Sequence, residues 1–80
     1  MKDTLSFIVK SIVDHPDSVS VEEREENGIT ILTVSVAKDD MGKVIGKEGK
    51  VIRSIRNIMK VKAMKHNKRI TVTLAENEKP

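Results

Sequence analysis

The segment of this chain best suited to chemistry is a run with two glycines around a lysine and a glutamate, Val44-Ile45-Gly46-Lys47-Glu48-Gly49-Lys50. Glycine allows positive φ in a tight reversal, and because it lacks a Cβ it lets an anion approach the backbone N–H groups. The run leads into an expected helix, whose unpaired N–H groups and positive dipole end favour an anion. Lys47 and Lys50 add formal charge. The segment is therefore predicted to bind phosphate.

The spacing of this segment excludes a nucleotide-hydrolysing P-loop. Gly42 and Gly46 have three residues between them instead of four, and Lys47 is followed by Glu48 where that motif needs Ser or Thr.

The two histidines do not suggest a metal site or a catalytic base. His15 and His66 each lie beside an expected turn, and the sequence brings no cysteine and no carboxylate cluster to them at ligand spacing. We find no nucleophile with a base and no paired catalytic carboxylates. The chain is therefore not expected to be an enzyme, and no cofactor, metal or small-molecule substrate is expected.

Length and composition indicate one small domain of 80 residues, which has little interior to spare for a deep catalytic cleft. The absence of cysteine excludes disulfides and thiolate metal sites and fits a reducing compartment. No apolar run approaches the roughly 18 to 20 residues that span a bilayer, and the start Met1-Lys2-Asp3-Thr4 lacks the apolar stretch of a secretory signal. We expect the whole chain to be the mature protein, in the cytoplasm and without membrane contact.

Charge is distributed unevenly along the chain. Residues 38–69 carry eleven Lys and Arg against three Asp and Glu, a net charge of +8, whereas the first 37 residues sum to −4. The second half is therefore the part expected to meet an anionic partner.

In the first half, the sequence predicts a helix and a hairpin. Asp3 or Thr4 is expected to cap a helix that ends near Asp14 and buries Leu5, Ile8, Val9 and Ile12. Strands are expected at 19–26 and 29–37, joined by Asn27-Gly28, the strongest short hairpin signal. The apolar phase of the second strand slips at Ile31-Leu32, which indicates either a bulge or a central strand with both faces partly covered.

In the second half, the sequence predicts two helices and a final strand. Asp39 and Asp40 are expected to cap a short helix over 41–45, and a longer helix is expected over 50–65. The buried face of the longer helix is expected to comprise Val51, Ile52, Ile55, Ile58 and Met59. A strand is expected over 70–74, followed by a polar tail, 76–80, that is expected to fray.

These residues resemble a known RNA-binding module. Ile45-Gly46-Lys47-Glu48-Gly49-Lys50 is similar to the GXXG motif of KH domains, in which that loop clamps the backbone of about four nucleotides. The element order matches the type II KH arrangement, and the chain as a whole resembles the small stand-alone bacterial KH proteins of the KhpA family. The resemblance implies an α+β fold of order αββααβ, a three-stranded sheet with the helices on one face, in a single domain over 1–80 with its core at about 4–75.

The resemblance also implies function and partners. It implies non-catalytic binding of single-stranded RNA, as an RNA chaperone or post-transcriptional regulator linked to cell shape and cell wall biogenesis. Homodimers, or a complex with a larger, KhpB-like KH protein, are the expected assemblies. The alternative is a protein-interaction adaptor or dimerisation module with little RNA affinity of its own. Phe7, Val61 and Met64, which lie off the expected core stripes, are candidates for such an interface.

Carried over by position, the resemblance predicts the residues that bind RNA. Gly46 and Gly49 would let the sugar–phosphate backbone pass, Lys47 and Lys50 would face phosphates, and the acidic Glu48 would weaken binding or point away. Val34 and Val36 would form the far wall of an apolar groove. The complete predicted set is Val34, Val36, Lys43, Val44, Ile45, Gly46, Lys47, Glu48, Gly49, Lys50, Ile52 and Arg53. Because the chain has only one aromatic residue, Phe7, the groove is expected to be aliphatic.

Overall fold

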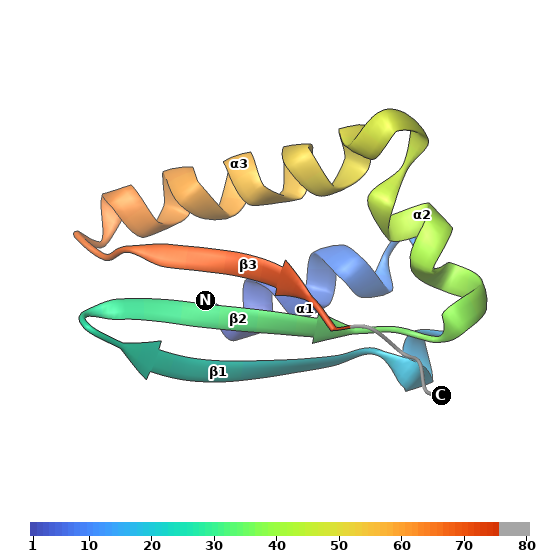
Figure 1. Cartoon of the computed structure of the whole chain (residues 1–80), viewed down its shortest axis with the longest axis horizontal. Helices are drawn as coiled ribbons and strands as arrows, with labels where there is room; N and C mark the ends of the chain where they lie inside the picture. The colour runs from blue at the N-terminus through green and yellow to red at the C-terminus, as the bar shows by residue number, and fades with distance from the viewer. Residues whose placement is uncertain (76–80) are drawn as a thin grey trace.

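The computed structural model describes residues 1–75 and has the predicted α+β order (Figure 1). Its elements are α1 (Lys2–Lys10), β1 (Ser20–Glu26), β2 (Ile29–Ser35), α2 (Met41–Ile45), α3 (Lys50–Lys65) and β3 (Ile70–Leu74), with short 3-10 turns at Pro16–Ser18, Lys38–Asp40 and Lys47–Gly49. The predicted polar tail lies outside the described residues.

The sheet is mixed, with β2 in the centre. β1 pairs with β2 antiparallel, and β3 pairs with β2 parallel, so that β1 and β3 are the two edge strands. The hairpin prediction is confirmed at Asn27 and Gly28, whose φ values of 52° and 81° suit the type I′ turn that follows the strand twist. The β1–β2 register is continuous from Ser20 to Glu26, so β2 has no bulge at Ile31-Leu32. The other interpretation of the phase slip, that this is the central strand of the sheet, is correct.

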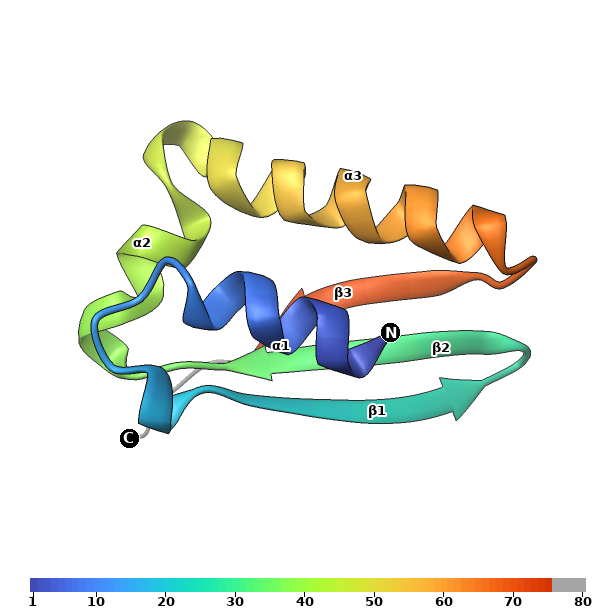
Figure 2. The ribbon, with the colours of Figure 1, turned by 180° about the vertical axis from the view of Figure 1, so that it is seen from behind.

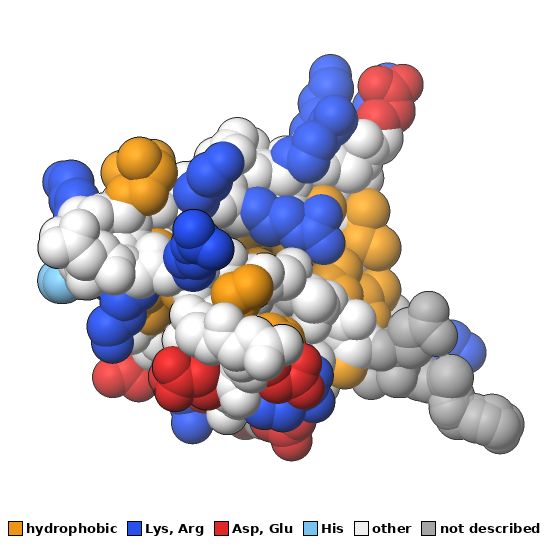
Figure 3. All heavy atoms as spheres, turned by 60° about the vertical axis from the view of Figure 1, so that its left-hand side comes forward, with side chains coloured by type: hydrophobic (Ala, Val, Ile, Leu, Met, Phe, Trp, Pro, Cys, Tyr) orange, Lys and Arg blue, Asp and Glu red, His pale blue; other side chains and the backbone are white. Residues whose placement is uncertain are grey.

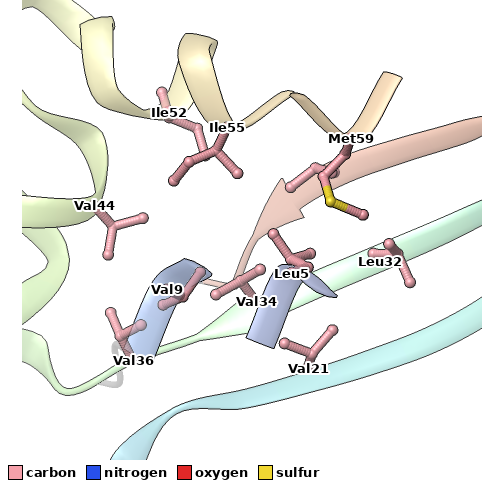
Figure 4. Close-up of a cluster of buried hydrophobic side chains, with 11 residues drawn as sticks. Leu5, Val9, Val21, Leu32, Val34, Val36, Val44, Ile52, Ile55 and Met59 are labelled. Atoms are coloured by element: carbon pink, nitrogen blue, oxygen red, sulfur yellow. The ribbon is translucent and has the colours of Figure 1, made fainter. Parts of the chain in front are cut away.

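The core lies between one face of the sheet and the helices. Leu5 and Val9 from α1 and Met59 from α3 are completely buried against Leu32 of β2. Figure 4 shows these side chains converging from the helices and the sheet. Thr33 and Thr73, whose hydroxyl oxygens are 3.2 Å apart, are only partly buried in neighbouring strands. Since strand side chains alternate between faces, they belong to the face opposite to Leu32 and Val72. The helices thus cover a single face, as predicted.

The first helix ends four residues earlier than predicted. Continuing the helix would commit the N–H of Asp14 to the carbonyl of Lys10. Instead the N–H groups of Asp14 and His15 donate to the two carboxylate oxygens of Asp40, at 3.1 and 2.9 Å. The helix also starts earlier, at Lys2 with Met1 in the N-cap position and no side-chain cap, so the predicted capping by Asp3 or Thr4 is wrong.

Asp40 does not cap α2 either, because its carboxylate is already used by the segment after α1. The side chain is completely buried. Burial alone would raise the pKa of Asp40, but the N–H donors of Asp14 and His15, with the nearby charges of His15 and Lys43, hold that pKa below its ordinary value. The ionised carboxylate of Asp40 therefore links the start of α2 to the segment that follows α1 through two hydrogen bonds.

The predicted burial of α3 is right for three of its five residues. Ile52, Ile55 and Met59 are buried, as is Ala63, whereas Val51 is half-buried and Ile58 is 51% exposed. β2 is also shorter than predicted and ends at Ser35. In α1, Leu5 and Val9 are buried and Ile8 is half-buried, but Ile12 is exposed because the chain has left the helix before it.

Candidate nucleic-acid interface

The loop between α2 and α3 is a sharp reversal at one end of the domain (Figure 1). Three of its residues have positive φ: Gly46 (77°), Glu48 (56°) and Gly49 (74°). The N–H of Gly49 donates to the carbonyl of Gly46 at 3.1 Å and closes the turn. Lys47 and Glu48 stand exposed at its tip, and α3 begins at the next residue, Lys50.

The two glycines of the loop serve different purposes. A Cβ on Gly46 would stand 2.7 Å from the Cβ of Val51 and 2.8 Å from its backbone nitrogen, closer than real contacts allow. A Cβ on Gly49 would meet nothing within 4 Å. Gly46 is therefore required by packing as well as by φ, whereas Gly49 needs only its φ and leaves open space beside the loop.

Arg53, one turn into α3, holds the loop in shape. Its Nη2 donates to the carbonyl of Glu48 at 2.9 Å, and its Nε donates to the carbonyl of Gly49 at 3.3 Å. The guanidinium thereby offsets the negative ends of two carbonyl dipoles at the place where an anion would approach. Arg53 therefore positions the loop. The N–H groups of its guanidinium that do not bond to the loop are available to a ligand.

The remaining predicted residues divide into exposed and buried ones. Lys43 is exposed and forms an ion pair with Asp14 at 3.4 Å, and Lys50 is also exposed. Ile45 is 37% exposed and is the accessible apolar residue before the loop. Val44 and Ile52 belong to the core, so they support the loop from within.

The predicted far wall of the groove is wrong. Val34 in β2 and Val36 just after it are 1% and 3% exposed and belong to the core, so neither side chain is presented to a ligand. The strand next to α3 at the open edge is β3, because β3 pairs with β2 on the side away from β1.

A groove of about 580 Å³ lies between α3 and the free edge of β3. Its wall on α3 includes Arg56, Asn57, Lys60 and Met64, and its wall on the β3 side includes Lys68, Arg69, Ile70, Thr71, Val72 and Thr73. The sequence indicated the basic residues of α3 but not that this strand faces them. The side chain of Arg56 crosses the groove, and its Nε donates to the carbonyl of Val72 at 3.1 Å.

The charges separate to opposite edges of the sheet. The basic residues of α3 and of the turn before β3 surround the groove, whereas the exposed Glu22, Glu23, Glu25 and Glu26 lie on β1. Figure 3 shows Lys and Arg side chains across the upper part of this face, over α3, and most of its Asp and Glu side chains near the lower edge, with one acidic side chain at the upper right and some basic side chains among the acidic ones below. The other long helix carries none of these groove residues: α1 lies beside α3 over the same sheet, as the view from behind shows (Figure 2). An anionic chain is therefore attracted to the α3–β3 edge and repelled from β1.

Neither a cluster of metal-ligating side chains nor a membrane-spanning helix occurs among the described residues. No group of three or more His, Cys, Asp or Glu within residues 1–75 is placed to hold a metal ion. In the same part of the chain, no helix is both long and apolar enough to cross a membrane.

Comparison with known proteins identifies the relatives of this chain. A family profile described as "KhpA/KhpB, KH domain" matches residues 2–74. A protein of Clostridium acetobutylicum named "RNA-binding protein KhpA" is 47% identical over 74 residues, which cover 92% of this chain and 99% of that protein. Proteins of the same name from Chlamydia pneumoniae and Halalkalibacterium halodurans are 38% and 36% identical, over 98% and 95% of this chain and the full length of each relative.

Proposed function

The chain belongs to the KhpA/KhpB KH-domain family, and on that premise we propose that it binds single-stranded RNA without catalysis, with the loop 46–49 on the sugar–phosphate backbone. The observation that carries the proposal is the open backbone at Gly49 between the exposed Lys47 and Lys50, at the start of a 16-residue helix. A phosphate at this position would meet backbone N–H groups, the positive end of the helix dipole and two ammonium groups. The relatives are named as RNA-binding proteins, which agrees with this proposal.

From the loop, the RNA strand would continue along the groove between α3 and β3. The groove is in the range of about 300 to 1,000 Å³ that is typical of small-ligand sites, with a volume of about 580 Å³. Its accessible apolar parts, among them Ile70 and Met64, can pack against bases, while Lys60, Lys68 and Arg69 surround them with positive charge. Because the groove has no aromatic residue, each base gains less than it would on an aromatic platform, and one domain is expected to bind weakly.

Weak binding by one domain favours assembly, and we propose that the chain works as a dimer or with a larger KH protein, in the cytoplasm, as an RNA chaperone or regulator. Phe7, Ile58 and Val61 are 73%, 51% and 55% exposed, and so supply apolar surface for a protein contact. Two linked domains would raise avidity by presenting a second site at high effective concentration. The adaptor function, in which this surface matters more than RNA, is the second candidate.

The test of RNA binding is the double variant Lys47→Asp, Glu48→Asp, measured by fluorescence anisotropy with a short labelled single-stranded RNA of mixed sequence. Asp tolerates the left-handed φ at position 48 at least as well as Glu, so the loop should keep its shape. Lys2→Asp, which changes the charge equally on an exposed residue of α1, is the matched control. We expect the double variant to lose binding and the control to keep it. Equal affinity of the folded double variant and the wild type would contradict the proposed clamp, and RNA affinity of the wild type no better than that of an unrelated basic protein would favour the adaptor.

A further inference from the structure

The hydrogen bond between Arg56 and Val72 occupies an acceptor on the free edge of the sheet. The N–H of Thr30 donates to the carbonyl of Arg69 at 2.9 Å, and the N–H of Ala75 donates to the carbonyl of Val34 at 2.8 Å. In a parallel sheet, the backbone N–H and C=O groups of one residue point toward the partner strand, and those of the next residue point away from it. Residues 69, 71, 73 and 75 therefore face β2, and the backbone groups of Val72 point outward into the groove, where its carbonyl meets Arg56.

Hydrogen-bond donors dominate the polar lining of this groove. Among the described residues that line it there are four cations, Arg56, Lys60, Lys68 and Arg69, and no Asp or Glu. Arg56 has five N–H donors, of which the one on Nε is engaged with Val72, so its terminal amino groups remain for a ligand. An exposed backbone carbonyl at Val72 would have been a strong acceptor, and Arg56 masks it.

We propose that Arg56 makes the groove select bases with keto groups, uracil and guanine, over adenine. This inference rests on the proposed RNA binding and adds base selection to it. Uracil offers O4, and guanine offers O6 and N7, all acceptors that a guanidinium can meet, and the pair of guanine acceptors suits Arg in particular. Adenine shares the N7 acceptor but places its N6 amino group, a donor, where guanine has O6. That donor would face the N–H groups of Arg56, whose Nε already occupies one of the two lone pairs of the Val72 carbonyl.

Other acceptors in the groove limit the selection but do not cancel it. The carbonyl of Ile70, which by the same alternation points outward, the hydroxyl of Thr71 and the amide oxygen of Asn57 can each accept a hydrogen bond. Thr73 is already engaged with Thr33 through its hydroxyl. We therefore expect a preference of about tenfold, at the lower end of what one well-placed arginine contact gives in base discrimination.

The test compares binding of labelled oligouridylate and oligoadenylate of about six nucleotides, somewhat longer than the about four that a KH domain grips. Arg56→Met keeps an unbranched apolar stem, removes the donors and frees the Val72 carbonyl. Lys65→Met removes the same charge from an exposed position of α3 outside the groove and is the control. We expect the wild type and Lys65→Met to prefer oligouridylate by about tenfold, and Arg56→Met to lose that preference. Stacking of oligoadenylate on itself affects all three proteins equally. The change in the ratio of oligouridylate to oligoadenylate affinity between the wild type and Arg56→Met is therefore the quantity that tests the proposal.

The outcomes separate this inference from the proposed function. No binding of either RNA by the wild type would overturn RNA binding itself, and the base selection with it. Binding without preference, or an unchanged ratio in Arg56→Met, would overturn only the selection by Arg56. If the variant does not fold, the wild type supplies a second measurement, because the NMR signal of the Arg56 Nε–H should shift when oligouridylate binds; an unmoved signal in a protein that binds oligouridylate would overturn the inference.

Discussion

Gly46 packs against Val51 so closely that a Cβ on the glycine would stand 2.8 Å from the valine backbone nitrogen. Gly49, three residues later, has the same kind of φ but open space around it. The loop thus has one glycine that the fold requires and one that a ligand can approach.

This difference predicts unequal costs of substitution. Gly46→Ala should lower the free energy of unfolding by about 3 kcal/mol or more, because its backbone lies in a region essentially restricted to glycine, which costs other residues about 1 to 3 kcal/mol, and because the added Cβ overpacks against Val51. Gly49→Asn should cost less than about 1 kcal/mol, because Asn tolerates that backbone and meets no neighbour. Urea unfolding followed by circular dichroism measures both. Similar losses for the two variants would contradict the assignment of packing to Gly46.

Arg53 is predicted to affect RNA affinity through the loop. Arg53→Met removes the donors to the carbonyls of Glu48 and Gly49, which should loosen the loop and weaken RNA binding by at least about fivefold and at most about 150-fold, since two such hydrogen bonds together contribute about 1 to 3 kcal/mol. Hydrogen exchange of the Gly49 and Lys50 amides should become faster in the variant. Lys65→Met, with the same loss of charge, should leave that exchange unchanged. Weaker binding without faster exchange would mean that Arg53 acts by touching RNA and not by holding the loop.

The dependence of RNA affinity on salt should report how many phosphates one domain contacts. The loop lysines and Arg53 reach about three or four phosphates, so the slope of log affinity against log salt should be about −2 to −3 for a single strand. A titration from low to high potassium chloride with monomeric protein measures it. A slope near about −6 would mean that the strand runs along the whole basic half or across two copies.

Asp40 predicts a dependence of stability on pH. Its pKa in the folded chain lies below the ordinary value of 3.8, so the carboxylate stabilises the fold fully above pH 3.8, and this contribution is lost as pH falls through the lower, folded pKa. Asp40→Asn should be less stable than the wild type at neutral pH, because the N–H groups of Asp14 and His15 lose a charged acceptor. The difference should shrink as pH falls below 3.8. Thermal unfolding over a pH series measures it, and a constant difference at all pH values would show that the charge of Asp40 is not responsible.

The proposed assembly is best tested at Val61. Met64 lines the groove, so an acidic substitution there would disturb RNA binding as well as any interface. Val61 is 55% exposed and is not part of the groove lining. We expect the wild type to self-associate in analytical ultracentrifugation and Val61→Glu to sediment as a folded monomer. A wild type that stays monomeric at high concentration would remove the homodimer, and an unchanged dimer in Val61→Glu would place the contact elsewhere.

Local chemistry made much of this fold predictable from the sequence. The Asn27-Gly28 turn depends on the backbone freedom of its own two residues, and α3 begins and ends where its sequence pattern predicts, at Lys50 and Lys65. The loop 46–49 was found in the same way, because glycines on either side of a lysine before a helix are visible without any knowledge of distant segments. The sequence by itself thus determined the element order and the position of the candidate phosphate site.

Contacts between distant residues decided the rest. α1 ends at Lys10, and Asp40, 26 residues beyond Asp14, accepts the Asp14 N–H that another helical turn would have used. The wall opposite α3 is β3 and not β2, because β3 pairs in parallel at the edge, which buries Val34 and leaves the Val72 carbonyl for Arg56. Neither result follows from propensity or periodicity, since each depends on which segments meet after the chain has folded, and hydrogen-bond acceptors are assigned only then.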